Sequence, residues 1–286
     1  MDLFAEGVIT SNNIEPTTEL VELFTIYWSK VMQPDQRSTM AYPFFYLRSE
    51  GFWHLVAQPG KQAILDATRN VTSMTHLQTF VQCARLNEEL YSLFCVEATR
   101  NLFRAVLIET YFATELQPVL IEQGSINVEA FRYSQELLER ARNQCTKEGL
   151  EDAERYRPAV RDQAFRRAVI QAYSHRCAVC GLRMITSDGH TAVDAAHIEP
   201  WSVSHNDNPT NGMALCRLCH WTFDEGLITV SAQYTVLTSR QLSTNQNFPG
   251  HLLTLTGRPI IGPEDQILMP DLDALSYHRK EVFRAR

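Results

Sequence analysis

Two pairs of cysteines constrain the fold of this chain more than any other feature. Cys177 and Cys180 form one C-x-x-C pair, Cys216 and Cys219 form a second, and 35 residues lie between the pairs. Each pair offers two thiolates from a tight turn, and two such turns complete a tetrahedral site suited to Zn²⁺. A site closed by four protein ligands leaves no position for a substrate, so this zinc is expected to be structural.

Length and composition indicate a folded protein of two domains, or of one domain with elaborations. The chain has 286 residues, of which 44% are hydrophobic, which is enough for cores that do not depend on disulfides. Its seven cysteines are an odd number, and the acidic segment MDLFAEGVIT does not resemble a signal peptide. No apolar run is long enough to span a membrane. We therefore expect a cytoplasmic protein without a membrane partner.

Apolar periodicity separates a helical first half from a mixed second half. Helical spacing recurs in three segments, 16–32, 74–112 and 127–146. Between the first two lies AYPFFYLRSEGFWHLVAQPG, which is aromatic and less regular. The polar stretch TKEGLEDAERYRP then interrupts the apolar pattern. We expect an α+β chain with three parts: a mainly helical domain at 1–147, a linker at 148–158, and a zinc-stabilised domain with a C-terminal extension at 159–286.

Three more residues capable of metal or proton chemistry follow the first cysteine pair. His197 ends a short β-like run and precedes a turn, Asn211 comes fourteen residues later, and His220 comes nine residues after that. If four cysteines fill the zinc site, His220 is free to bind a second metal ion. A neutral imidazole is also a suitable general base near pH 7.

The segments CAVCG, AAHIEPW, NGMALCRLCH and FDEGL together resemble HNH endonucleases of the ββα-metal class, over about residues 160–230. The resemblance implies phosphodiester hydrolysis, with His197 as the general base. It implies that Asn211 holds the loop carrying His197 in register. It also implies that His220 helps to bind one catalytic Mg²⁺ or Mn²⁺, while the zinc pins two β segments and a helix together.

One position departs from the family pattern. Many members have an Asp or His directly before the base, as a second ligand of the catalytic ion, and this chain has Ala196 there. We expect Asp194 to supply that ligand if the strand bends, because it lies one pleat back on the same side. Water, Glu199 or Asp224 are the alternatives.

The N-terminal segment QRSTMAYPFFYLRSEGFWHL resembles the sulfur-binding domains that precede HNH domains in restriction endonucleases acting on phosphorothioate DNA. Phosphorothioate sulfur is large, polarizable and poorly hydrated, and the group keeps its negative charge. An apolar cup beside cationic donors suits it. The predicted set has Tyr42 and Pro43 as the cup with Tyr46 nearby, and as phosphate-binding cations Arg37, Arg48 and Lys61. The alternative is that YPFFYL is simply core around a Pro turn.

These resemblances imply a modification-dependent restriction endonuclease used in defence, with double-stranded phosphorothioate DNA as its substrate. A net charge of −7 at first disfavours a nucleic-acid partner, but six arginines between residues 155 and 176 form a local basic run. In one alternative, the protein is an HNH nuclease that is targeted by a methylated base or by a partner protein. Another is a zinc-stabilised DNA-binding protein without catalysis. A homodimer is compatible with these readings, because a single HNH site cuts one strand at a time.

Overall fold

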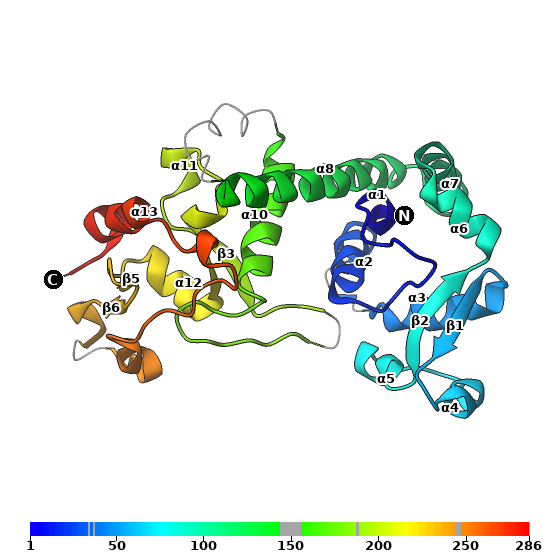
Figure 1. Cartoon of the computed structure of the whole chain (residues 1–286), viewed down its shortest axis with the longest axis horizontal. Helices are drawn as coiled ribbons and strands as arrows, with labels where there is room; N and C mark the ends of the chain where they lie inside the picture. Colours follow the sequence, from blue (N-terminus) through cyan, green and yellow to red (C-terminus); the bar gives the residue numbers. More distant parts are fainter. Residues whose placement is uncertain (34, 37, 144–155, 187–188, 244–246, 286) are drawn as a thin grey trace. The chain divides into compact units, whose positions relative to one another are not determined.

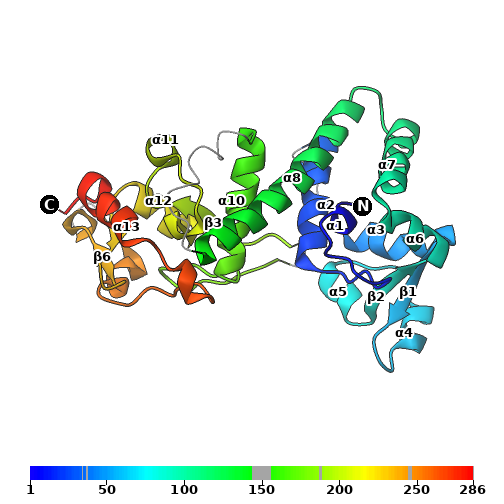
Figure 2. The same cartoon turned by 45° about the horizontal axis from the view of Figure 1, so that its top comes forward.

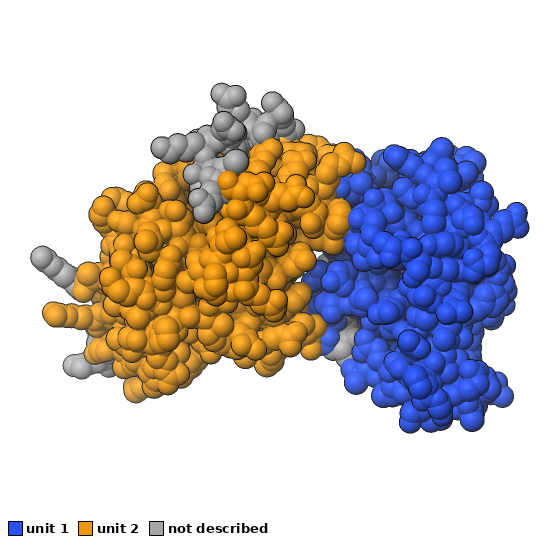
Figure 3. Space-filling model, in the orientation of Figure 1, with its two compact units in different colours: residues 1–128, 186–190 blue, residues 129–185, 191–286 orange. Residues whose placement is uncertain are grey.

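A computed structural model describes residues 1–285 of the chain except 34, 37, 144–155, 187–188 and 244–246. The chain forms two compact units (Figure 3). Unit 1 comprises Met1–Val128 and Thr186–His190, and unit 2 comprises Glu129–Ile185 and Thr191–Arg286. Most of the expected linker, 148–158, lies outside the described residues.

Unit 1 is mainly helical with one small sheet (Figure 1). Its elements in chain order are α1 Asp2–Ala5, α2 Thr18–Val31, α3 Ala41–Tyr46, η1 Leu47–Glu50, β1 Trp53–Ala57, α4 Gln62–Ala67, α5 Met74–Gln78, β2 Val81–Leu86, α6 Glu88–Cys95 and α7 Glu97–Tyr111. Strands β1 and β2 are antiparallel, with Trp53 opposite Leu86. A long helix, α8 Gln117–Arg142, starts in unit 1 and ends in unit 2.

Local sequence signals account for α2 but not for β2. Thr17 caps α2, since its side chain accepts a hydrogen bond from the backbone N–H of Leu20 at 3.3 Å. The helical periodicity expected across 74–112 is wrong at Val81–Leu86, which form β2. Pairing with β1 buries most of this strand, and such tertiary pairing overrides a local helical pattern.

The core of unit 1 is aromatic. Phe44 and Phe45 of α3 are fully buried, and Trp53 donates a hydrogen bond from Nε1 to the backbone oxygen of Phe44 at 2.7 Å. Phe80 meets Phe45 edge to face. The irregular aromatic segment of the sequence therefore forms a helix, a 3-10 turn and a strand around this core.

Unit 2 contains two strands followed directly by a helix. Its elements in chain order are α10 Pro158–Ala172, β3 Val193–His197, α11 Trp201–Ser204, η2 Pro209–Asn211, β4 Gly212–Cys216, α12 Arg217–Asp224, β5 Ile228–Val230, β6 Val236–Thr238, η3 Arg240–Ser243, η4 Gly250–Leu255, η5 Gln266–Leu268, α13 Leu272–Tyr277 and η6 His278–Val282. The order β3, β4, α12 is the expected ββα arrangement, so the α+β fold class is confirmed.

Helix α10 covers the β3–β4 hairpin and lies beside β3 (Figure 2). The strands are antiparallel, with His197 opposite Gly212. Gly212 has no space for a side chain, because a Cβ there would lie 2.8 Å from Phe165 and 2.6 Å from Val169. The missing side chain thus lets α10 approach the end of the hairpin where His197 lies.

The C-terminal tail packs back on the hairpin domain through His278. This buried imidazole stacks on Phe223 of α12, with ring centroids 3.6 Å apart. Its Nδ1 lies 2.8 Å from the hydroxyl of Thr229, and its Nε2 lies 3.1 Å from the backbone oxygen of Phe223. Arg279 donates to the backbone oxygen of Val230 at 2.8 Å. The tail is therefore part of the core of unit 2.

None of the helices in the described ranges is both long and apolar enough to cross a membrane.

His278 should make the stability of unit 2 depend on pH. Burial lowers the pKa of His278 from 6.5 to about 4, whereas the unfolded chain keeps the ordinary value. Between these values the unfolded chain binds a proton that the folded chain does not. The stabilisation is thus complete above the unfolded pKa and declines as pH falls toward the folded one. Thermal unfolding should show a loss of about 2 kcal/mol from this group between about pH 7.5 and about pH 5.

His278→Gln should lower stability near neutral pH and reduce its fall on acidification. The exposed His251→Gln is the matched control and should leave the pH dependence of wild type unchanged. Equal pH dependence in wild type and both variants would contradict this account of His278.

Candidate functional site

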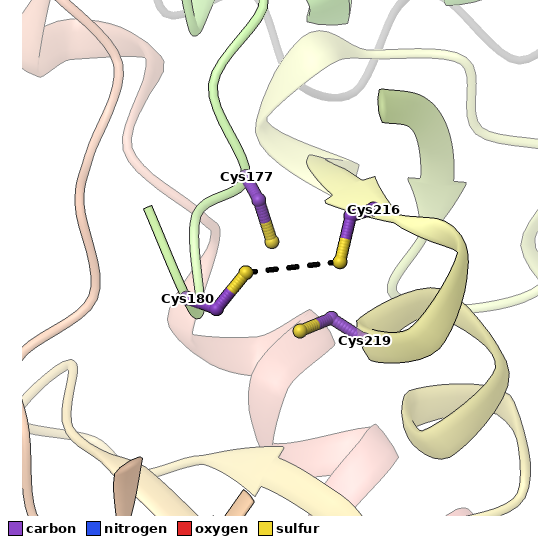
Figure 4. Close-up of side chains that lie close together, drawn as sticks. All are labelled: Cys177, Cys180, Cys216 and Cys219. Atoms are coloured by element: carbon purple, nitrogen blue, oxygen red, sulfur yellow. Dashed lines mark hydrogen bonds between the residues drawn. The ribbon is translucent and has the colours of Figure 1, made fainter. Parts of the chain in front are cut away.

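Four thiols converge in unit 2 from two turns (Figure 4). Cys177 and Cys180 lie in the turn after α10, Cys216 ends β4, and Cys219 lies in the first turn of α12. Their sulfur atoms all lie within 4.8 Å of one another, and those of Cys180 and Cys216 are 3.7 Å apart. Four ligands at the usual Zn–S distance place tetrahedral sulfurs about 3.8 Å apart. The cluster therefore fits a zinc ion.

Backbone hydrogen bonds shape the first of these turns. The N–H of Cys177 donates to the oxygen of Leu182, and the N–H of Gly181 donates to the oxygen of Cys177, both at 2.9 Å. Gly181 has φ +77°, a left-handed conformation that glycine adopts without strain. The N–H of Ala178 donates to Ala214 of β4 at 2.8 Å. The turn is thereby tied to the strand that carries the second cysteine pair.

The close packing of the sulfurs shifts the pKa of neighbouring thiols in opposite directions. Hydrogen bonding with Cys180 lowers the pKa of Cys177 to about 7, while the same contact raises the pKa of Cys180. Contact with Cys177 lowers the pKa of Cys216 and raises that of Cys219. The protein by itself thus favours only some thiolates. A bound cation allows all four to be deprotonated.

His197, the expected general base, ends β3 and is partly exposed, with 23% of its side chain accessible. Its ring lies flat on that of Phe165, with centroids 3.7 Å apart and an interplanar angle of 7°. Its Nε2 lies 3.1 Å from a carboxylate oxygen of Asp207. The imidazole is therefore held both by stacking and by a hydrogen bond.

Asn211 is buried and bridges both ends of the loop after His197. Its side-chain oxygen accepts from the N–H of Glu199 at 2.9 Å. Its side-chain nitrogen donates to the backbone oxygens of Glu199 and Asn206, each at 3.0 Å. These bonds connect loop residues 199–206 to the start of β4. The contacts are of the kind that the predicted positioning role requires.

His220 lies on α12 directly after Cys219 and is partly exposed to solvent. Its Nε2 is 3.5 Å from a carboxylate oxygen of Asp224, one helical turn further along. Burial raises the pKa of Asp224. An imidazole and a carboxylate in this arrangement can bind one divalent cation together.

Asp194, the predicted second ligand, makes a different contact. Its carboxylate accepts from Nε of Arg166 at 2.9 Å and from the N–H of Ala195 at 3.0 Å, and 57% of its side chain is exposed. Ala196 is buried.

The predicted sulfur cup lies on α3. Tyr42 and Tyr46 are exposed one helical turn apart, and Pro43 between them is half-buried. The buried Phe44 and Phe45 face the opposite way, into the core. The core interpretation of YPFFYL therefore describes the two phenylalanines, whereas the tyrosines form a surface.

The predicted phosphate-binding cations differ in their surroundings. Arg48 donates to the backbone oxygen of Thr68 at 2.9 Å, and its guanidinium lies 3.9 Å from the ring centroid of Phe45. Lys61 is exposed at the start of α4. Arg37 lies outside the described residues.

Sequence reasoning missed the residues packed around His197. Asp207 gave no signal, because it lies in a polar loop among other turn-forming residues. Arg161 was counted in the basic run, yet its side chain is only 8% exposed and its guanidinium lies 3.5 Å from the ring centroid of Trp201. The packing of α10 on the hairpin brings Arg161 to this site, and the loop between α11 and η2 brings Asp207.

Comparison with known proteins defines the class of the C-terminal site. Residues 177–231 match the family model described as HNH endonuclease, and this segment holds all four cysteines together with His197, Asn211 and His220. Residues 17–127 match the model described as ScoMcrA-like, DNA sulfur-binding domain. Both resemblances drawn from the sequence are therefore confirmed: the chain carries an HNH endonuclease domain and a DNA sulfur-binding domain.

A solved structure described as "Modification dependent TagI restriction endonuclease" is also similar to this chain. The sequence identity is 26% and the TM-score is 0.31, over 41% of this chain and 37% of that one. The aligned part is thus well under half of either protein. A search of curated proteins found no match.

Replacing one cysteine of the cluster should abolish metal binding. Cys219→Ser removes a buried thiolate from a closed tetrahedral set, so bound zinc should be lost and unit 2 should be destabilised by several kcal/mol. Elemental analysis of the purified protein measures the first effect, and thermal unfolding measures the second. Cys95→Ser, at an exposed cysteine of unit 1, should retain the zinc of wild type. Equal zinc content in both variants would exclude the four-thiolate site.

Proposed function

We propose that this protein is a modification-dependent DNA endonuclease that binds phosphorothioate DNA and hydrolyses phosphodiester bonds in double-stranded DNA. The observation that carries the proposal is the presence, in one chain, of a DNA sulfur-binding domain and an HNH endonuclease domain. Selective binding and hydrolysis then reside in different segments. A restriction enzyme that acts in the cytoplasm in defence against foreign DNA must combine selective DNA binding with DNA hydrolysis.

His197 is the general base of the proposed reaction. The imidazole takes a proton as a water O–H bond breaks, the water oxygen attacks phosphorus, and the bond from phosphorus to the 3′ oxygen breaks. Stacking on Phe165 supports this role, because it restricts the ring while leaving an edge exposed. Asn211 positions the loop after His197 through its three backbone hydrogen bonds.

His220 and Asp224 are the proposed ligands of a catalytic Mg²⁺ or Mn²⁺. When bound, such an ion stabilises charge on the phosphate and on the leaving oxygen. The spacing of the two side chains supports Asp224, which was an alternative at the sequence level, over Asp194. The carboxylate of Asp194 is engaged by Arg166. The zinc bound by the four cysteines has the separate role of holding the hairpin and α12 together.

Tyr42, Pro43 and Tyr46 are the proposed sulfur-binding surface. Two exposed tyrosines at i and i+4 around a proline offer apolar contact area without a carboxylate between them. Lys61, Arg48 and Arg37 are the proposed contacts to neighbouring phosphates. Arg48 would have to exchange its contacts with backbone oxygens for a phosphate, so Lys61 has the better support.

Domain limits and assembly complete the proposal. The recognition domain covers 1–147 and the nuclease covers 159–286, with 148–158 between them. The division between the compact units falls earlier than this proposed limit, since residues from 129 onward in α8 group with unit 2, where Leu138 and Ala141 pack with Ala168. Two copies of the chain would supply one active site for each DNA strand.

Cleavage of one plasmid, with and without phosphorothioate modification, tests the proposal in the presence of Mg²⁺ or Mn²⁺. Wild type should cut the modified plasmid alone. His197→Ala should lower the cleavage rate by about 10²- to 10⁴-fold, because it removes the general base. His251→Ala, an exposed histidine of unit 2, is the matched control and should cut at the rate of wild type.

Each contrary result has its own meaning. Equal cutting of both plasmids would leave a nuclease but remove sulfur recognition. Cutting of a methylated plasmid alone would indicate that the N-terminal domain recognises a methylated base and not phosphorothioate sulfur. Undiminished cutting by His197→Ala would contradict the general-base assignment.

Tyr42→Ala should weaken binding to phosphorothioate DNA about tenfold, since it removes part of the apolar surface around the sulfur. Fluorescence anisotropy with modified and unmodified duplexes measures the effect, in a His197→Ala background so that the DNA stays intact. Tyr111→Ala, at a tyrosine of unit 1 that is 79% exposed, is the matched control. An equal loss of affinity for both duplexes, or for both variants, would count against the sulfur cup.

A further inference from the structure

Asp207 lies against His197 and has no part in the reaction as described above. It belongs to the loop between α11 and η2, and only 3% of its side chain is exposed. Its Oδ1 lies 3.1 Å from Nε2 of His197. Within the described residues, Nδ1 of His197 has no hydrogen-bonding partner. A carboxylate in this place accepts a hydrogen bond from Nε2–H, which leaves the lone pair on Nδ1 free.

A buried arginine compensates the charge of this carboxylate. Nε of Arg161 lies 3.8 Å from Oδ2 of Asp207, and only 8% of its side chain is exposed. The guanidinium stacks on Trp201, which holds it in place. Oδ2 of Asp207 has no hydrogen-bonding partner within the described residues, so His197 is the hydrogen-bonding partner of this carboxylate. A buried carboxylate is thus directed at one imidazole nitrogen.

We propose that Asp207 is a positioning residue that holds His197 in the Nε2–H tautomer, so that Nδ1 is the atom that accepts the proton from water. The inference rests on the proposed role of His197 as general base. It adds a second requirement to that role, because an imidazole in the other tautomer cannot accept a proton at Nδ1.

The proton balance follows from this arrangement. As the water O–H bond breaks, its proton passes to Nδ1 and the imidazole becomes an imidazolium. Asp207 keeps its negative charge and stabilises the imidazolium through the bond to Nε2–H, as a carboxylate does for an imidazole in related acid–base arrangements. The guanidinium of Arg161 lies beside the other carboxylate oxygen, Oδ2, with its Nε 3.8 Å away.

Asp207→Asn tests the inference with almost no change of shape. Arg161 should attract the amide oxygen, which turns the amide NH₂ group toward Nε2 of His197. Nε2 must then accept a hydrogen bond, so the proton moves to Nδ1 and the base is blocked. The single-turnover cleavage rate should fall by about 10²- to 10⁴-fold, with affinity for DNA unchanged. The ring ¹⁵N chemical shifts of His197 should report a change from the Nε2–H to the Nδ1–H tautomer.

Two variants make the experiment specific. His197→Gln assigns the ring signals by removing them. Asp162→Asn removes an exposed carboxylate that lies 3.6 Å from Nη2 of Arg161 and should preserve both the tautomer and the rate. Retention of the Nε2–H tautomer in Asp207→Asn would overturn the inference, as would a change of tautomer without loss of rate.

Failure of the inference can be told from failure of the proposed function. If Asp207→Asn resembles wild type while His197→Ala is inactive, the general base stands and the positioning role falls. If His197→Ala cuts like wild type, the general-base assignment is itself wrong and the inference falls with it.

Discussion

Four sulfur atoms within 4.8 Å of one another join the strand pair that carries His197 to the helix that carries His220. Cys216 is the last residue of β4 and pairs with Val193, so the same strand register places His197 opposite Gly212. Cys219 lies in the first turn of α12, and His220 is the next residue of that helix. In the proposed reaction, zinc at these cysteines would take no part in hydrolysis but would align the groups proposed for it, because a hairpin of five-residue strands has too little core to align them alone.

The sequence predicted those parts of the molecule that depend on spacing along the chain. The cysteine pairs, His197, Asn211 and His220 fall within one short segment, and the α+β class and both family resemblances followed from such segments. Asp207, Arg161 and Phe165 could not be found in this way. Arg161 and Phe165 reach the site only once α10 has packed on the hairpin, and Asp207 only once the loop after α11 has folded. A single sequence carries no periodicity or spacing that expresses these contacts.

Two other long-range contacts were equally hidden from the sequence. Val81–Leu86 continued a helical pattern in the sequence and became a strand because β1 was available to pair with it. Arg48 was predicted as a phosphate contact from its position beside aromatic residues. In the folded unit its guanidinium satisfies the carbonyl of Thr68, a partner twenty residues away. Long-range contacts of this kind decide whether a charged side chain supports the fold or meets a ligand.

Gly212 shows how a residue without a functional group can have the mutational profile of an active-site residue. Phe165 and Val169 fill the space that a side chain at position 212 would need, and the ring of His197 stacks on Phe165. Any larger residue at this position displaces Phe165, on which the imidazole of His197 stacks. In a saturation mutagenesis screen for activity, Gly212 would score beside the histidines. The intolerance of position 212 to substitution would then reflect the close approach of α10 to the β3–β4 hairpin, which leaves no space for a larger side chain.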